Sequence, residues 1–327
     1  DQLLNWFGAS DVTFPYADAY MTIYTAGTFF ALLGTGMNYF ITAQGFPLLG
    51  MTTTLIGAVI NIVLDPVFIF LFDMGVAGAA VATVLAQMCS CAFVLCTLRR
   101  KKMPVPLGIV RPDRDTGKRI VKIGFSPFLI LASDSIIIIA LNAVLQYYGG
   151  PEYGDTLITA ATIVQSYMLL ITSPMLGITG GSQPLISFNY GANRPDRIRK
   201  TFFWVLMLCV CFTAFMFLIS RIMPWYFVRI FTDEPAYAEL AVWGIRVFTL
   251  MIVPLSFQYV IVDGLTALGM TKISLSLSLT RKSLYFAATC LIPFIWAARD
   301  AFYAEPFADG VSACISCAIF FFIYRKY

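Results

Sequence analysis

The sequence contains no histidine, and only 12% of its 327 residues are charged. Without histidine, the chain can hold neither a histidine-ligated zinc or haem nor a serine–histidine–aspartate triad. Soluble globular proteins carry about 25% charged residues, so this low share excludes soluble enzymes, DNA-binding modules and disordered proteins. Apolar residues make up 59% of the chain. We therefore expect an integral membrane protein whose main partner is the lipid bilayer, with no nucleic acid partner.

The eight cysteines all lie inside apolar runs. Cys314 and Cys317 form a CxxC pair, but no second pair accompanies them. We interpret the cysteines as small apolar helix residues rather than as a metal or redox site. The sequence thus predicts no resident cofactor and no enzymatic activity.

Nine apolar segments are long enough to cross a bilayer as helices, each of which needs ~20 residues. Barrel strands would alternate polar and apolar residues over ~10 positions, and these segments do not. We predict an all-α membrane protein with spans at 20–43, 50–72, 76–98, 122–148, 156–188, 200–223, 238–262, 272–297 and 307–325. Pro174 and Pro184 predict a kink in the fifth span.

Basic residues are concentrated in alternate loops. Sixteen of the 22 lysines and arginines lie in 99–122 and 189–200, at Lys272, and in the tail at Arg325 and Lys326, whereas the opposite loops hold most of the acids. Because cytoplasmic loops of membrane proteins are enriched in Lys and Arg, we expect residues 99–121 and the C-terminus to be cytoplasmic, and residues 1–19 and 149–155 to be external. A nucleic-acid-binding loop is the less favoured interpretation.

The first three spans resemble the last three. GVAGAAVAT at 75–83 resembles FADGVSACI at 307–315, and AQG at 43–45 resembles ALG at 267–269. This predicts a parallel repeat of two six-helix lobes. Residues 1–98 would form the back three helices of the N-terminal lobe, 99–121 a basic inter-lobe linker, and 122–327 the complete C-terminal lobe. The front three helices would need ~110 residues before Asp1.

Ionisable residues inside spans mark sites or pathways, because burying their charge in lipid is costly. Asp65 lies one helical turn after Asn61, so both face the same way, and Pro66 loosens the backbone beside them. Thr83 projects from the small-residue face of the next span. These groups suit Na⁺, and the carboxylate alone suits H⁺. A purely structural hydrogen bond between Asp65 and Asn61 is the alternative.

Two further aspartates fall within spans. Asp134 lies near the centre of the fourth span, with Asn142 two turns beyond, and Asp263 lies near the inner end of the seventh, where it could cap a helix or pair with Arg281. Arg281 and Lys282 are long enough to snorkel toward the cytoplasm. Polar side chains and flexible methionines within the predicted C-terminal lobe indicate a substrate cavity. They are Asp134, Asn142, Gln165, Met168, Met175, Gln258 and Asp263. Helix packing is the alternative for any one of them.

The segment NIVLDP at 61–66, with GVAGAAVAT after it and GGSQPLISFNYGA at 180–192, resembles the multidrug and toxic compound extrusion family. The resemblance covers nearly the whole chain and is closer to the bacterial multidrug branch. It implies two six-helix lobes and cation-coupled drug export. It also implies a cation site at Asn61, Asp65 and Thr83, which a further aspartate would complete on a helix that this sequence does not contain. Asp134 and Asp263 match two other family carboxylates by position, although one branch has Glu at the place of Asp134.

The sequence therefore predicts an antiporter of the cytoplasmic membrane that exports amphipathic, often cationic compounds in exchange for Na⁺ or H⁺, and we expect it to be a monomer. Asp65 with Asn61 and Thr83 would bind the coupling ion, and Asp134 a second ion or the substrate cation. A related lipid-linked oligosaccharide flippase is the first alternative, but it would need a cationic cavity. An intramembrane enzyme is a remote second.

Overall fold

The computed structural model describes residues 14–100, 103–108 and 113–324 and divides into an N-terminal unit (Asp1–Asp113) and a C-terminal unit (Arg114–Tyr327). The boundary falls within the predicted linker 99–121. Residues 101–102 and 109–112 of that linker lie outside the described residues, as do residues 1–13 of the predicted outer segment and the tail 325–327. We predict that these two units correspond to the N-terminal lobe (1–98) and the C-terminal lobe (122–327).

The N-terminal unit contains three long helices, α2 (Phe14–Ala43), α3 (Pro47–Pro66) and α4 (Gly75–Leu98), with a π-helical segment, η1 (Val67–Leu71), after α3. Helices α2 and α4 approach each other closely because glycines line their contact: a Cβ at Gly34 would lie 3.3 Å from the Cα of Cys91. Small residues permit this kind of close packing between membrane helices.

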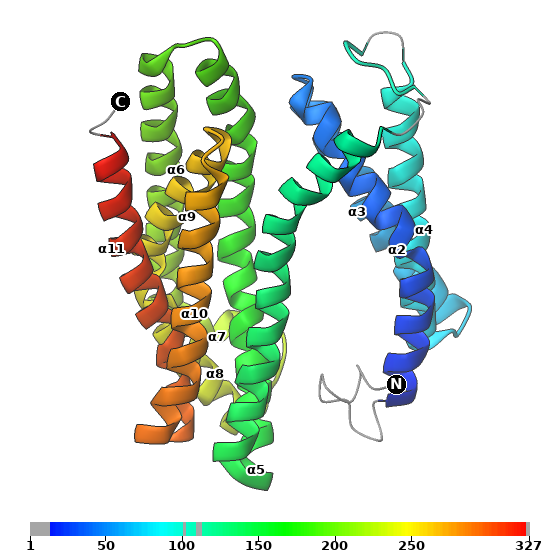
Figure 1. Ribbon diagram of the computed structural model, residues 1–327. Helices are drawn as coiled ribbons and strands as arrows, with labels where there is room; N and C mark the ends of the chain where they lie inside the picture. The colour runs from blue at the N-terminus through cyan, green and yellow to red at the C-terminus, as the bar shows by residue number, and fades with distance from the viewer. Residues whose placement is uncertain (1–13, 101–102, 109–112, 325–327) are drawn as a thin grey trace. The chain divides into compact units, whose positions relative to one another are not determined.

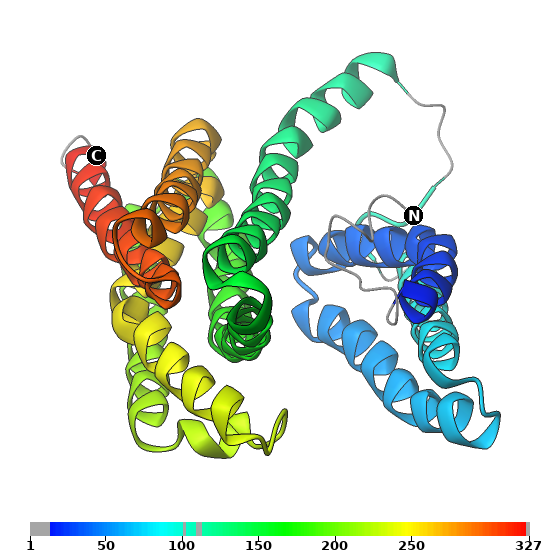
Figure 2. The ribbon, with the colours of Figure 1, turned by 90° about the horizontal axis from the view of Figure 1, so that it is seen from below.

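The C-terminal unit is a helical bundle (Figures 1 and 2). Its helices are α5 (Arg114–Gly191), α6 (Pro195–Ile222), α7 (Pro224–Val228), α8 (Pro235–Phe248), α9 (Ile252–Ala267), α10 (Thr271–Ile295) and α11 (Ala304–Tyr324), with 3₁₀ turns η2 (Thr249–Met251) and η3 (Ala298–Tyr303). Large side chains from α5, α8, α9 and η3 form its main core, including Ile171, Ile245, Leu255 and Phe302. No strand occurs among the described residues.

Helix α5 is two helices joined at Gly150, the one residue of α5 with non-helical dihedral angles (φ 71°, ψ −175°). Backbone angles stay helical past Pro174 and Pro184, where the sequence predicts a kink. The join separates the segments Arg114–Gly150 and Tyr153–Gly191, which correspond to the predicted fourth and fifth spans.

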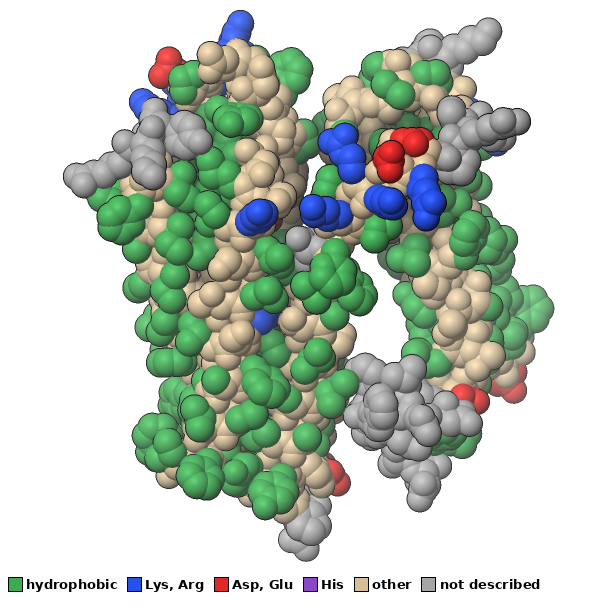
Figure 3. All heavy atoms as spheres, viewed as in Figure 1, with side chains coloured by type: hydrophobic (Ala, Val, Ile, Leu, Met, Phe, Trp, Pro, Cys, Tyr) green, Lys and Arg blue, Asp and Glu red, His purple; other side chains and the backbone are tan. Residues whose placement is uncertain are grey.

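Seven helical segments of the described chain are long and apolar enough to cross a membrane. They are Pro47–Leu71, Gly75–Leu98, Arg114–Gly150, Tyr153–Gly191, Pro195–Ile222, Pro235–Ala267 and Ala298–Ile323. Helices α2 and α10, at the predicted first and eighth spans, are not among them, so the count of nine stays a prediction. On the face in Figure 3, hydrophobic side chains cover the helix flanks, and Lys and Arg gather over their upper parts.

Candidate functional site

Three predicted site residues of the N-terminal unit come together in the structure. The Asn61 amide Nδ2 on α3 donates to Oδ1 of Asp65, 3.1 Å away, and to Oγ1 of Thr83 on α4, 3.3 Å away. The Thr83 hydroxyl donates in turn to the carbonyl of Ala79 at 2.9 Å. The three side chains are only partly buried. We call Asn61, Asp65 and Thr83 the α3–α4 cluster.

The backbone is irregular immediately beside this cluster. Pro66 has no N–H to donate to the carbonyl one turn before it, and the helix widens into η1 directly afterwards. The N–H of Phe72 there reaches back to the carbonyl of Val67 at 3.0 Å, a π-type bond. π-Segments are frequent at functional sites. A carboxylate, an amide and a hydroxyl beside loosened backbone form an oxygen-rich environment that suits a hard cation or a proton.

The second predicted carboxylate, Asp134 on α5, forms an ion pair with Lys282 on α10. The Lys282 side chain is 15% exposed and the Asp134 side chain 43%. The sequence indicated that Lys282 could extend toward the cytoplasm. In the structure its side chain does not. It stays inside the bundle because a carboxylate faces it there. Asn142 lies two turns further along α5 and is partly buried.

Asp263 does not pair with Arg281. It lies on α9 against the side chains of Thr179 and Gln183 from α5. Gln258, one turn and a half earlier on α9, is buried and accepts a hydrogen bond from the hydroxyl of Ser312 on α11. These two residues thus take part in separate helix contacts, and their sharing a substrate cavity with Asp134 stays a prediction.

The predicted cavity methionines lie in the main core of the C-terminal unit. Met175 is fully buried and Met168 is 8% exposed. Gln165, one turn before Met168 on α5, is partly buried. In this structure both methionines pack between helices. Their role in binding substrate stays a prediction.

The sequence reasoning missed a buried ionic cluster that joins α10 to α11. Arg281 Nε lies 2.7 Å from Oδ1 of Asp309, and its Nη2 lies 2.6 Å from Oε1 of Glu305. The charge pattern counted Glu305 and Asp309 among the acids of the external side, and it placed Arg281 inside the eighth span as a possible partner of Asp263. Instead α11 begins at Ala304, so both acids are helical and face α10. Their i, i+4 spacing, opposite an arginine inside an apolar span, was the available signal.

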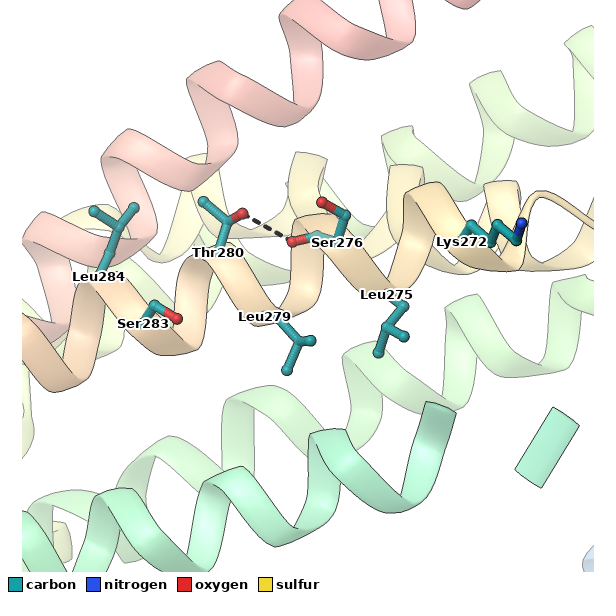
Figure 4. A pocket seen from close by; sticks show the side chains of 7 residues that line it. All are labelled: Lys272, Leu275, Ser276, Leu279, Thr280, Ser283 and Leu284. Atoms are coloured by element: carbon teal, nitrogen blue, oxygen red, sulfur yellow. Dashed lines mark hydrogen bonds between the residues drawn. The ribbon is translucent and has the colours of Figure 1, made fainter. Parts of the chain in front are cut away.

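A groove of about 580 Å³ runs along α10 and is lined by side chains of that helix (Figure 4). Leucines and hydroxyl-bearing residues alternate along it: Lys272, Leu275, Ser276, Leu279, Thr280, Ser283 and Leu284. The Thr280 hydroxyl is bonded back to the carbonyl of Ser276 at 2.8 Å. Mixed apolar and weakly polar walls suit amphipathic molecules.

The family model described as MatE matches residues 131–290. Among curated proteins, the chain is 27% identical over 252 residues to the multidrug export protein MepA of Staphylococcus saprophyticus and 28% identical over 253 residues to MepA of Staphylococcus aureus strain N315. Each match covers 76% of this chain and 54% of the relative. The chain therefore spans about half the length of these curated relatives.

Solved structures confirm the fold. The chain is similar to a multidrug resistance MATE family transporter of the MOP superfamily in its outward-facing conformation, with a TM-score of 0.86, 21% identity and coverage of 96% of this chain and 70% of that one. An inward-facing conformation gives a TM-score of 0.76 at 20% identity, with coverage of 96% and 73%. The predicted all-α membrane fold is thus correct.

Proposed function

We propose that the chain is a member of the MatE family of multidrug and toxic compound extrusion transporters, which its similarities support, and that the protein exports amphipathic, often cationic compounds across the cytoplasmic membrane in exchange for Na⁺ or H⁺. The family is one of transport proteins, which confirms the expectation that the chain is not an enzyme. The name of the MepA relatives, multidrug export protein, supports the substrate class. The inward-facing and outward-facing solved structures support alternating access.

The α3–α4 cluster is the observation that carries the coupling role. It holds one carboxylate, Asp65, whose charge changes when a proton or Na⁺ binds, and it joins two helices through Asn61 and Thr83. An ion that binds one conformation more tightly than the other shifts the equilibrium between them. Binding at Asp65 would therefore bias the inward-facing and outward-facing states.

Asp134 would bind a second coupling ion or the substrate cation. Its carboxylate is partly exposed and held by Lys282, so a substrate cation would compete with the lysine ammonium for it. The groove of mixed apolar and weakly polar walls along α10 lies on the helix that carries Lys282. We further expect the basic loop at 99–121 to face the cytoplasm and the protein to act as a monomer.

The flippase alternative is not favoured by the buried charges. It would need cations free to hold a pyrophosphate. Arg281 and Lys282 lie inside the C-terminal unit, but each is already paired with carboxylates. Neither offers a free positive charge for a phosphate group.

The Asp65→Asn variant tests the coupling role. Asparagine keeps the size and an acceptor oxygen but can neither ionise nor change charge. In the protein expressed from its complete gene in a pump-deficient strain, we expect normal membrane levels and drug binding but loss of ion-driven efflux, at least tenfold by rate. Efflux is measured with a fluorescent cation after an imposed Na⁺ or pH gradient.

The matched control is Asp73→Asn. Asp73 is exposed and has a left-handed backbone (φ 51°) that Asn also adopts, so this variant should pump like the wild type. Wild-type efflux and unchanged ion dependence in Asp65→Asn would leave only the structural role for Asp65 and move the coupling role to Asp134.

A further inference from the structure

The buried ionic cluster of α10 and α11 has one more negative charge than positive. Arg281 is the one cation that contacts Glu305 and Asp309 directly among the residues with described side chains. The nearest further cation, Lys282, is matched by Asp134. If all five groups are ionised, two cations (Arg281 and Lys282) face three carboxylates (Glu305, Asp309 and Asp134), which leaves a surplus of one negative charge. A buried charge without a partner is strongly unfavourable.

The geometry identifies the carboxyl group at which this surplus resides. Asp309 is fully buried, and Arg281 binds only its Oδ1. Its other oxygen, Oδ2, is buried and has no hydrogen-bond partner among the described residues. A buried carboxylate oxygen without a donor is costly, whereas the same oxygen carrying a proton no longer bears charge.

Glu305 is the less suitable place for a proton. It lies in the first turn of α11 and accepts a hydrogen bond from the hydroxyl of Tyr285 on α10, which stabilises an ionised carboxylate. It also accepts the short 2.6 Å bond from Arg281. Asp309 lies one turn deeper in the helix, away from that helix end.

The titratable and charged groups that face Asp309 come from three helices. They are Glu305 on α11, Arg281, Lys282 and Tyr285 on α10, and Tyr259 on α9. Both tyrosines are neutral at ordinary pH, so they leave the charge count unchanged.

We propose that the Arg281–Glu305–Asp309 cluster is a one-proton binding site, with the proton on Oδ2 of Asp309 at neutral pH. Protonation leaves one guanidinium and one carboxylate, so the cluster becomes neutral inside the bundle. This site lies in the C-terminal unit, separate from the α3–α4 cluster, and it holds whether or not Asp65 is the coupling residue.

Infrared difference spectroscopy of the purified protein, expressed from its complete gene and reconstituted in lipid, tests the proposal. A protonated carboxyl group has a carbonyl-stretch band that shifts in D₂O, distinct from the bands of a carboxylate. We expect the wild-type band to lose the contribution of one group in Asp309→Asn. We expect the same loss in Glu305→Gln, because removing either acid balances the charge without a proton.

Arg281→Gln separates the proposal from simple misfolding. Without the guanidinium the cluster has a surplus of two negative charges, so the band should grow by the contribution of a second protonated group. Unfolding would expose the acids to water and could only weaken the band at neutral pH. Asp65→Asn serves as the control and should leave the contribution of Asp309 intact.

Two results would overturn the proposal. One is a wild-type minus Asp309→Asn difference that contains only carboxylate bands, which would mean that Asp309 is ionised. The other is an unchanged protonated band in Glu305→Gln, which would mean that charge surplus does not determine protonation. Loss of efflux in Asp65→Asn would bear on the coupling role alone.

Discussion

Arg281 and Lys282 of α10 are matched by carboxylates on other helices of the C-terminal unit. Lys282 on α10 pairs with Asp134 on α5, and the neighbouring Arg281 pairs with two acids of α11. Adjacent residues point in different directions from a helix, about 100° apart at 3.6 residues per turn. Two consecutive cations can therefore fix α10 against two different helices at once.

The pair of Lys282 and Asp134 gives a prediction for stability. Lys282→Met keeps the length of the side chain but leaves the carboxylate without its partner. The pair is intermediate between an exposed and a buried one, so we expect a loss of about 1–3 kcal/mol of unfolding free energy. Thermal or denaturant unfolding in detergent measures it.

Two further variants check the origin of that loss. Adding Asp134→Leu to Lys282→Met should recover most of the stability, because no unpaired charge is left. Lys272→Met, at an exposed position of the same helix, should change it by less than about 0.5 kcal/mol. An equal loss in Lys272→Met would attribute the effect to the helix surface instead of the ion pair.

At the same scale, local spacing could predict the Asn61–Asp65 contact of the α3–α4 cluster but not the contacts between helices, which include Thr83 with Asn61 and Arg281 with its two acids. Asn61 and Asp65 are one turn apart, and local spacing alone puts them on one face. Arg281 meets Glu305 and Asp309 across a gap of 24 and 28 residues, and its partners depend on how two helices pack. Local patterns carry no direct information on that pairing.

At the scale of elements, two helix–helix turns have the same geometry. The N–H of Phe46 bonds the carbonyl of Ile41, and the N–H of Met270 bonds that of Leu265, each over five residues. Both turns pass through a left-handed glycine, Gly45 with φ 91° and Gly269 with φ 79°. This is the Schellman ending of a helix. The matching turns are consistent with the AQG and ALG repeat in the sequence.

Gly269→Ala is the variant that tests this requirement. A Cβ in the left-handed region costs roughly 1–2 kcal/mol, even though open space surrounds Gly269. We therefore expect a lower melting temperature in detergent. Gly177→Ala is the opposite control, since Gly177 has helical backbone and nothing within 4 Å of an added Cβ, and it should be neutral or stabilising by up to about 1 kcal/mol. A fall in both variants alike would show that the backbone angle is not the cause.

The hydropathy of the sequence predicted which segments are helical more accurately than it predicted the residues at which the helices begin and end. The fourth span was predicted at 122–148, but its helix begins at Arg114, and the first span was predicted from residue 20, whereas α2 is already helical at Phe14, the first described residue. Apolar runs mark the part of a helix that lies in lipid, whereas backbone hydrogen bonds continue into polar flanks. The π-helical segment η1 was not foreseen, because Pro66 predicts a loosened ladder without defining its new form.

At the scale of the whole molecule, many large apolar side chains face outward. Leu32, Ile62, Phe188 and Phe294 are all at least 70% exposed. In water such a surface would aggregate, but in lipid it is the expected outer surface of a spanning protein. The exposed apolar surface and the seven candidate spans together support a multi-pass membrane protein.

The direction of insertion is the remaining whole-molecule prediction. The positive-inside rule puts residue 105 on the cytoplasmic side and residue 233 outside. Val105 is 68% exposed, and Asp233 lies in the exposed non-helical segment between α7 and α8. In right-side-out vesicles, an impermeant thiol reagent should label Asp233→Cys but not Val105→Cys, and inside-out vesicles should reverse the result. The native cysteines all lie in helices, so the protein without an added cysteine gives the background to subtract. Labelling of residue 105 alone in right-side-out vesicles would invert the predicted topology, and with it the face from which the proposed substrate and coupling ion would enter.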